Sequence, residues 1–159
     1  MPTSYDPILI AQLRGKLLTD GLSGVLVPHA DAHQSEYLPP SAERLARLSG
    51  FSGSAGQAIV LADEAALFVD GRYTLQARDQ VNAKIFPVQA IAAMSPEAWL
   101  RTRLNPGDRI GYDPWLHTSA QLEPFKDLCT ELEAHLVALD ANPIDALWPD
   151  RPPPPSSPL

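Results

Sequence analysis

The stretch Gln57-Ala58-Ile59-Val60-Leu61-Ala62-Asp63-Glu64-Ala65-Ala66-Leu67-Phe68-Val69 contains two short apolar runs separated by a polar connection. Each run is too short for a helix and rich in residues that favour strands, so we expect strands at 57–61 and 65–69. The connection between them predicts a hairpin, in which the two strands are antiparallel. At least this part of the expected sheet is therefore antiparallel.

The residues before the hairpin predict a helix, a strand and a second helix. Asp6 and Pro7 are typical of a helix N-cap and first turn, and Gly21 is expected to end that helix. Gly24–Val27 is short, apolar and β-branched, so it predicts a buried strand. A short helix is expected at Ser41–Leu48.

Helices and strands alternate after the hairpin. Pro87 cannot donate a hydrogen bond to a neighbouring strand, and Thr118 with Gln121 matches a helix capping box. The expected elements are a helix at 72–81 capped by Asp70, an edge strand at 84–89, a helix at 95–105, a strand at 109–112, a helix at 118–135 and a strand at 136–139. This pattern predicts an α/β fold of three layers, in which a mixed β-sheet carries helices on both faces.

Composition excludes several classes of protein. A chain of 159 residues with 45% hydrophobic residues can bury one core. Its net charge of −7 argues against nucleic acid or an anionic membrane as a partner. A single cysteine, Cys129, excludes an internal disulfide framework, and the first residues lack the basic and apolar regions of a signal peptide. We therefore expect a cytoplasmic location.

The end of the chain differs in composition from the rest. Six of the 17 prolines lie between Pro149 and Pro158, which favours an extended polyproline II conformation. We therefore divide the chain into a domain at 1–147 and a Pro-rich linker, or an artificial end, at 148–159.

The segment His29–Tyr37 concentrates two imidazoles and two carboxylates just after a buried strand, where α/β proteins place their sites. A metal site needs three or four converging ligands, and residues two apart on an extended chain point to opposite sides. We therefore favour a polar loop at a surface or domain interface. A metal site and direct contact with a substrate are the alternatives.

Two other motifs have a structural and a functional interpretation. The glycines of Gly50–Gly56 fit neither the dinucleotide-binding pattern nor a nucleophile elbow, so they predict a tight turn. In Asp70-Gly71-Arg72-Tyr73, the arginine could bind a carboxylate or a peptide end, or it could make a structural contact with Asp70. No pair of carboxylates is placed to act as general acid and base, and His117 and His135 have no ligand partners nearby in sequence.

Four motifs, taken in their order and spacing, resemble one family. They are His29-Ala30-Asp31-Ala32-His33-Gln34-Ser35-Glu36-Tyr37, Ser49-Gly50-Phe51-Ser52-Gly53-Ser54-Ala55-Gly56, Asp70-Gly71-Arg72-Tyr73 and Trp148-Pro149-Asp150-Arg151-Pro152. The set resembles the N-terminal domain of the three-domain Xaa-Pro aminopeptidases (aminopeptidase P), which is related to the N-terminal domains of prolidase and creatinase. The resemblance covers nearly the whole chain and implies a ribonuclease H-like creatinase N-terminal fold.

The resemblance implies a parent metallopeptidase, a hydrolase that removes an N-terminal residue preceding proline. In that family a separate C-terminal domain holds two divalent metal ions, usually manganese. It implies no catalytic residue, no metal ligand and no cofactor in this chain, which would wall the substrate cleft and support dimerisation.

The same resemblance suggests partners and site residues. The expected partners are the middle and C-terminal domains of the same polypeptide, proline-containing peptides bound by the parent, and a second copy in a homodimer. By the matching motifs, Arg72 is the first candidate to lie near the substrate cleft, followed by His33 and Glu36. The alternative function is a free-standing module that binds a small peptide or a small acid.

Overall fold

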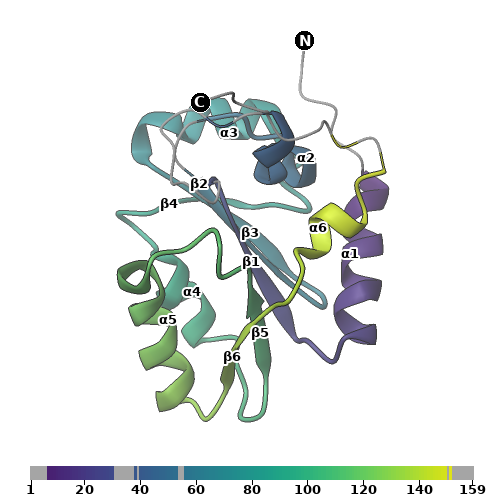
Figure 1. Ribbon diagram of the computed structural model, residues 1–159. Coiled ribbons are helices and arrows are strands. Elements are labelled where there is room, and N and C mark those ends of the chain that lie inside the picture. Colours follow the sequence, from purple (N-terminus) through teal and green to yellow (C-terminus); the bar gives the residue numbers. More distant parts are fainter. Residues whose placement is uncertain (1–6, 31–37, 39, 54–55, 150, 152–159) are drawn as a thin grey trace, which may run out of the picture.

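The structure is a computed structural model that describes residues 7–30, 38, 40–53, 56–149 and 151. In this part of the chain a six-stranded mixed sheet, of order β4-β3-β2-β1-β5-β6, lies between two layers of helices (Figure 1). The strands are β1 (Gly24–Pro28), β2 (Gly56–Leu61), β3 (Ala65–Val69), β4 (Val88–Ala90), β5 (Arg109–Tyr112) and β6 (His135–Ala138). The predicted three-layer α/β fold is therefore confirmed.

Helices cover both faces of this sheet. The α-helices are α1 (Pro7–Thr19), α2 (Arg44–Ser49), α3 (Thr74–Gln80), α4 (Pro96–Arg101), α5 (Ser119–Glu131) and α6 (Pro143–Ala146), and two 3₁₀ turns are η1 (Pro40–Ala42) and η2 (Gly71–Tyr73). Figure 1 shows α1 and α6 on one side of the sheet and α4 and α5 on the other. No helix in the described residues is long and apolar enough to cross a membrane.

The predicted hairpin forms the middle of the sheet. β2 and β3 are antiparallel, and the Leu61 amide donates to the Glu64 carbonyl across the turn at 2.7 Å. β2 is also antiparallel to β1, where Gly24 lies opposite Leu61. A Cβ at Gly24 would stand 2.5 Å from Leu61 Cδ2 and 2.7 Å from the Val60 carbonyl oxygen, so only glycine fits this close approach.

The core consists of two clusters, one on each face of the sheet. Along β2, Ala58 and Val60 face the first cluster with α1, α2 and α6, whereas Ile59 and Leu61 face the second with α4 and α5. This alternation follows from the two-residue period of a strand. In the second cluster the Phe68 and Trp99 rings meet edge to face, with their centroids 5.8 Å apart.

Three element boundaries differ from those predicted. α5 ends at Glu131 instead of continuing to His135, because Glu133 has a φ of 60° and reverses the chain into β6. α4 ends at Arg101 instead of 105. β4 is shorter than the expected edge strand, because the amides of Ile85 and Phe86 both donate to the Asn82 carbonyl in a turn.

Two predicted helices begin differently. The expected helix at 72–81 consists of η2 followed by α3, and the helix expected at 41–48 consists of η1 followed by α2.

The helix α6 was not predicted at all, although Asn142 caps it by accepting a hydrogen bond from the Ile144 amide at 2.9 Å. Trp148 packs against the first cluster, so the folded part of the chain continues to at least this residue.

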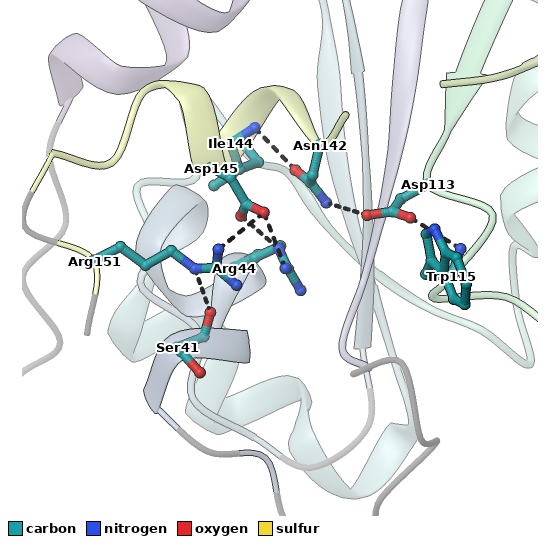
Figure 2. Close-up of polar contacts among 8 residues, drawn as sticks. All are labelled: Ser41, Arg44, Asp113, Trp115, Asn142, Ile144, Asp145 and Arg151. Atoms are coloured by element: carbon teal, nitrogen blue, oxygen red, sulfur yellow. Dashed lines mark hydrogen bonds and ion pairs between the residues drawn. The ribbon is translucent and has the colours of Figure 1, made fainter. Parts of the chain in front are cut away.

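A network of polar contacts ties α6 to α2 (Figure 2). Arg44, which is 8% exposed, donates from Nε to Asp145 Oδ1 at 2.7 Å and from Nη2 to Asp145 Oδ2 at 3.1 Å. Arg151 Nη1 lies 3.2 Å from Asp145 Oδ2, and Arg151 Nε donates to the Ser41 carbonyl at 2.9 Å. One carboxylate thus pairs with two arginines that are distant in sequence, Arg44 and Arg151.

Replacing Arg44 with alanine is expected to lower the free energy of unfolding by about 2 kcal/mol, because a charged hydrogen-bonded pair is lost from a mostly buried position. Urea denaturation of the wild type and the variant measures this difference. The matched control is Arg101→Ala, since Arg101 pairs with Glu131 but is 53% exposed and should cost less than about 1 kcal/mol. An equal decrease in the free energy of unfolding in the two variants would contradict the larger contribution assigned to the Arg44–Asp145 pair.

Candidate functional site

Several strand ends meet at one edge of the sheet. β5 is parallel to β1, and β2 is antiparallel to both β1 and β3, so β1, β3 and β5 end where β2 begins. The chain runs from β1 through β2 and β3 to β4 on one side, and then returns to β5 and β6 on the other. The carboxyl ends of β1 and β5 are therefore a topological switch point, where open α/β sheets commonly bind ligands.

A pocket of about 310 Å³ lies at this edge. Its walls come from the end of β1, the start of β2, the residue after β4, the start of α4, the loop after β5 and α5. The lining residues are Pro28, His29, Ala30, Gly56, Gln57, Ile91, Pro96, Glu97, Leu116, His117, Gln121 and Phe125. The volume is in the range of small-molecule sites.

His117 lines this pocket, and its ring carries one hydrogen-bond acceptor. Its Nδ1 lies 3.1 Å from the Asp113 carbonyl oxygen, which can only accept, so Nδ1 carries the proton and the neutral ring keeps a lone pair on Nε2. His117 Nε2 is buried and has no hydrogen-bond partner among the described residues. Burial lowers the pKa of His117, which favours the neutral ring at pH 7.

His29 is the only member of the predicted polar segment 29–37, apart from Ala30, that lies within the described residues. Its side chain is 7% exposed, and its Nε2 lies 3.8 Å from Glu43 Oε1. The candidates His33 and Glu36 lie outside the described residues. The polar-loop, metal-site and substrate-contact interpretations of this segment therefore all stay predictions.

Arg72 lies in η2, directly after β3, at the same edge of the sheet. Its Nε donates to Asp70 Oδ1 at 3.1 Å, so the structural contact with Asp70 that the sequence allowed is present. The Arg72 amide donates to the same carboxylate, and the amide and side-chain hydrogen bonds together lower the pKa of Asp70. The side-chain hydrogen bond and the charge of Asp70 raise the pKa of Arg72. The Arg72 side chain is nevertheless 76% exposed, and within the described ranges its terminal guanidinium nitrogens make no hydrogen bond.

Neither a metal centre nor a reactive thiol is found in the described part of the chain. It contains no group of three or more His, Cys, Asp and Glu side chains that could hold a metal ion. Cys129 is buried on α5, and burial raises the pKa of its thiol. An uncharged, buried thiol is a poor nucleophile.

Sequence reasoning missed the role of His117 at the pocket. It found no ligand partner nearby in sequence, and among the described residues the ring makes its polar contact with a backbone carbonyl, that of Asp113. The available signal was the position of His117 a few residues after a buried strand.

His117 is expected to make the folded domain less stable at low pH. Because burial lowers the pKa of the folded-state imidazole below its usual value of 6.5, the unfolded chain takes up a proton at His117 at a higher pH than the folded chain does. The free energy of unfolding should therefore fall as the pH drops below about 6.5. Urea denaturation at about pH 7.5 and about pH 5.5 checks this, and His117→Gln should lose less stability than the wild type between the two values.

Other titratable groups near His117 are Asp113, whose charge opposes the shift, and His29 and Glu97, which line the same pocket. His135→Gln is the matched control, because His135 is exposed on β6 and this variant should keep the pH dependence of the wild type. If His117→Gln also keeps the pH dependence of the wild type, His117 is not the group that destabilises the domain at low pH.

Comparison with known proteins shows which family this chain resembles. A family model for the creatinase/prolidase N-terminal domain matches residues 10–146. Aminopeptidase P2 of Arabidopsis thaliana is 41% identical over 140 residues, which are 86% of this chain and 20% of the plant protein. Xaa-Pro aminopeptidase 2 of Homo sapiens is 33% identical over 151 residues, which are 94% of this chain and 22% of the human protein. The chain thus spans about a fifth of the length of these curated relatives.

Solved structures share the fold. The X-prolyl aminopeptidase of Caenorhabditis elegans, a cytosolic enzyme with a di-nuclear active site, matches with a TM-score of 0.83 and 33% identity over 92% of this chain and 26% of that chain. The N-terminal domain of the cytoplasmic peptidase PepQ from Mycobacterium tuberculosis matches with a TM-score of 0.66 and 23% identity over 89% of this chain and 99% of that chain. The chain belongs to the creatinase/prolidase N-terminal domain family, as the resemblance of its four motifs predicted.

Proposed function

We propose that this chain is the non-catalytic N-terminal domain of a metal-dependent Xaa-Pro aminopeptidase, which removes the residue that precedes proline at the N-terminus of a peptide. The observation that carries the proposal is the extent of the match. Nearly all of this chain aligns with Xaa-Pro aminopeptidases, but only about a fifth of each relative is covered. The larger remainder would hold the chemistry.

The metal ions of the parent, for which manganese is our expectation, would lie in that remainder. The described residues do not fit such a site, since they bring together no group of three metal-ligating side chains. We therefore assign no metal ligand and no catalytic step to them.

The contribution of this domain would be to wall the substrate cleft with the sheet edge that carries Arg72. The exposed guanidinium has terminal nitrogens without a hydrogen-bond partner in the described part of the chain, and such a group binds the carboxylate end of a short peptide well. His33 and Glu36 remain further candidates, because their segment directly follows β1 in sequence and β1 ends at this edge. A homodimer of the parent, in the cytoplasm, completes the proposal.

The isolated chain is expected to show no manganese-dependent cleavage of a Xaa-Pro peptide. Its described residues supply neither a metal site nor a pair of groups placed for acid–base catalysis. Release of the N-terminal residue is measured with and without manganese, and a full-length Xaa-Pro aminopeptidase serves as the positive control. Turnover clearly above the blank would overturn the non-catalytic assignment.

Arg72→Ala in a full-length polypeptide that carries this domain is expected to lower kcat/KM for Xaa-Pro peptides by an amount worth about 1–3 kcal/mol, because one charged hydrogen bond to the substrate is lost. Arg78→Ala is the matched control, since Arg78 is an exposed arginine of α3, six residues after Arg72 in sequence. Unchanged kinetics in a folded Arg72→Ala protein would leave Arg72 with the structural contact to Asp70 alone.

The second candidate function is a free-standing module that binds a small peptide or a small acid, and the pocket at the end of β1 favours it. Calorimetric titration of the isolated chain with proline-containing peptides separates the two functions. Micromolar affinity would favour the module, because one wall of a composite cleft should bind such peptides weakly by itself.

A further inference from the structure

Most of the exposed large apolar side chains of this domain lie at one edge of the sheet. In the described sheet β1, β3, β4, β5 and β6 run in one direction and β2 runs in the other, so five carboxyl ends share an edge, which we call the carboxyl edge. Among the described residues six large hydrophobic side chains are exposed, and two of these are on α1. The other four follow strands that end at the carboxyl edge, and they are Leu75, Ile91, Met94 and Trp115.

Trp115 is 74% exposed although the backbone around it is held by hydrogen bonds. Its amide donates to Asp113 Oδ1 at 2.9 Å, and the Leu116 amide donates to the Asp113 carbonyl at 3.0 Å. A tryptophan on a fixed backbone has little conformational freedom to lose when a partner covers it. Tryptophan is also enriched among the residues that contribute most to protein interfaces.

Ile91 and Met94 lie on a loop that neighbours the loop of Trp115. Ile91 follows β4, Leu116 is next to Trp115 in sequence, and both line the same pocket. The loop after β4 is also a fixed turn, because the Met94 amide donates to the Ala90 carbonyl at 2.9 Å. Exposed apolar side chains that are grouped in this way mark interaction sites, whereas single ones do not.

The loop of Trp115 is bonded to the segment in which the family domain ends. The family match ends at residue 146, in α6. Asn142, which caps α6, donates from Nδ2 to Asp113 Oδ2 at 3.0 Å, so one carboxylate binds both this segment and the Trp115 amide (Figure 2). The aligned part is 20% of the plant relative and 22% of the human one, so most of each polypeptide lies outside the match. Because the matched domain is an N-terminal one, that larger part follows it and begins near this loop.

We propose that the carboxyl edge packs, through Trp115, Ile91 and Met94, against an apolar surface of the polypeptide that follows this domain in the parent. The proposal rests on the proposed function, since it requires a parent longer than the family domain. Burial of the three side chains removes apolar area from water, which favours the contact. Arg72 lies at the same edge, so this contact would also hold the proposed cleft wall against the part of the parent that performs the chemistry.

Hydroxyl-radical labelling read by mass spectrometry tests the proposal, because it measures the solvent access of single side chains. The 159-residue chain is compared with a full-length polypeptide that carries this domain. We expect the labelling rate of Trp115 to be roughly fivefold lower in the full-length polypeptide, as for a residue at the centre of an interface, and the rates of Ile91 and Met94 to fall with it. Leu18 is the internal control, because it is 81% exposed at the end of α1 that leads into β1, at the opposite edge of the sheet. Its labelling rate should be the same in both proteins.

Trp115→Ser tests whether Trp115 holds the contact. In the full-length polypeptide this variant should raise the labelling rate of Met94 roughly threefold, toward its value in the 159-residue chain. The matched control is Leu18→Ser, which removes an equally exposed side chain and should leave that rate unchanged. In the 159-residue chain Trp115→Ser should not change the Met94 rate, which separates loss of an interface from local distortion.

Two results would overturn the proposal. The first is an equal labelling rate of Trp115 in the 159-residue chain and in the full-length polypeptide. The second is a dimer of the 159-residue chain in sedimentation velocity that Trp115→Ser dissociates, because the edge would then be a contact between two copies.

Cleavage of a Xaa-Pro peptide, measured in the same full-length preparations, separates this proposal from the proposed function. Activity together with an accessible Trp115 would overturn the interface alone. A covered Trp115 in a folded polypeptide without this activity would overturn the proposed function alone.

Discussion

The position of β1 between two neighbours of opposite direction is the constraint on which the rest of the structure depends. Its pairing with β2 is antiparallel and its pairing with β5 is parallel, so the chain must leave β1 to one side and return to the other. Every residue from Gly24 to Val27 is buried, which leaves no solvent-facing side on this strand. Two apolar layers, and hence helices on both faces, follow from that burial.

The parts of the fold that were predictable are those fixed by short-range chemistry. The hairpin after Leu61 and the capping box of Thr118 and Gln121 both form as expected, because their hydrogen bonds join residues three apart. The end of α5 was not predictable in this way. A glutamate at a φ of 60° has no propensity signal, and Glu133 adopts it because the chain must turn into β6.

The candidate site was predictable in its place but not in its members. Position after a buried strand directed attention to the end of β1, where the pocket lies, and to Arg72 in η2, whose role stays a prediction. His117 and Glu97 could not be paired from sequence, since the pocket joins the loop after β5 to the start of α4 only once the sheet has formed. Spacing along the chain carries no information about such a juxtaposition, whereas the order of the strands does.

The two arginines on Asp145 also have a consequence for biosynthesis. Arg44 and Asp145 are 101 residues apart, and Arg151 and Ser41 are 110 apart, so these contacts join segments that are distant in sequence. During synthesis the amino-terminal half emerges from the ribosome first. Arg44 of α2 therefore has no Asp145 carboxylate to pair with until α6 has emerged. The contacts of Arg44 and Ser41 with this part of the chain can therefore form only after Asp145 and Arg151 have been synthesised.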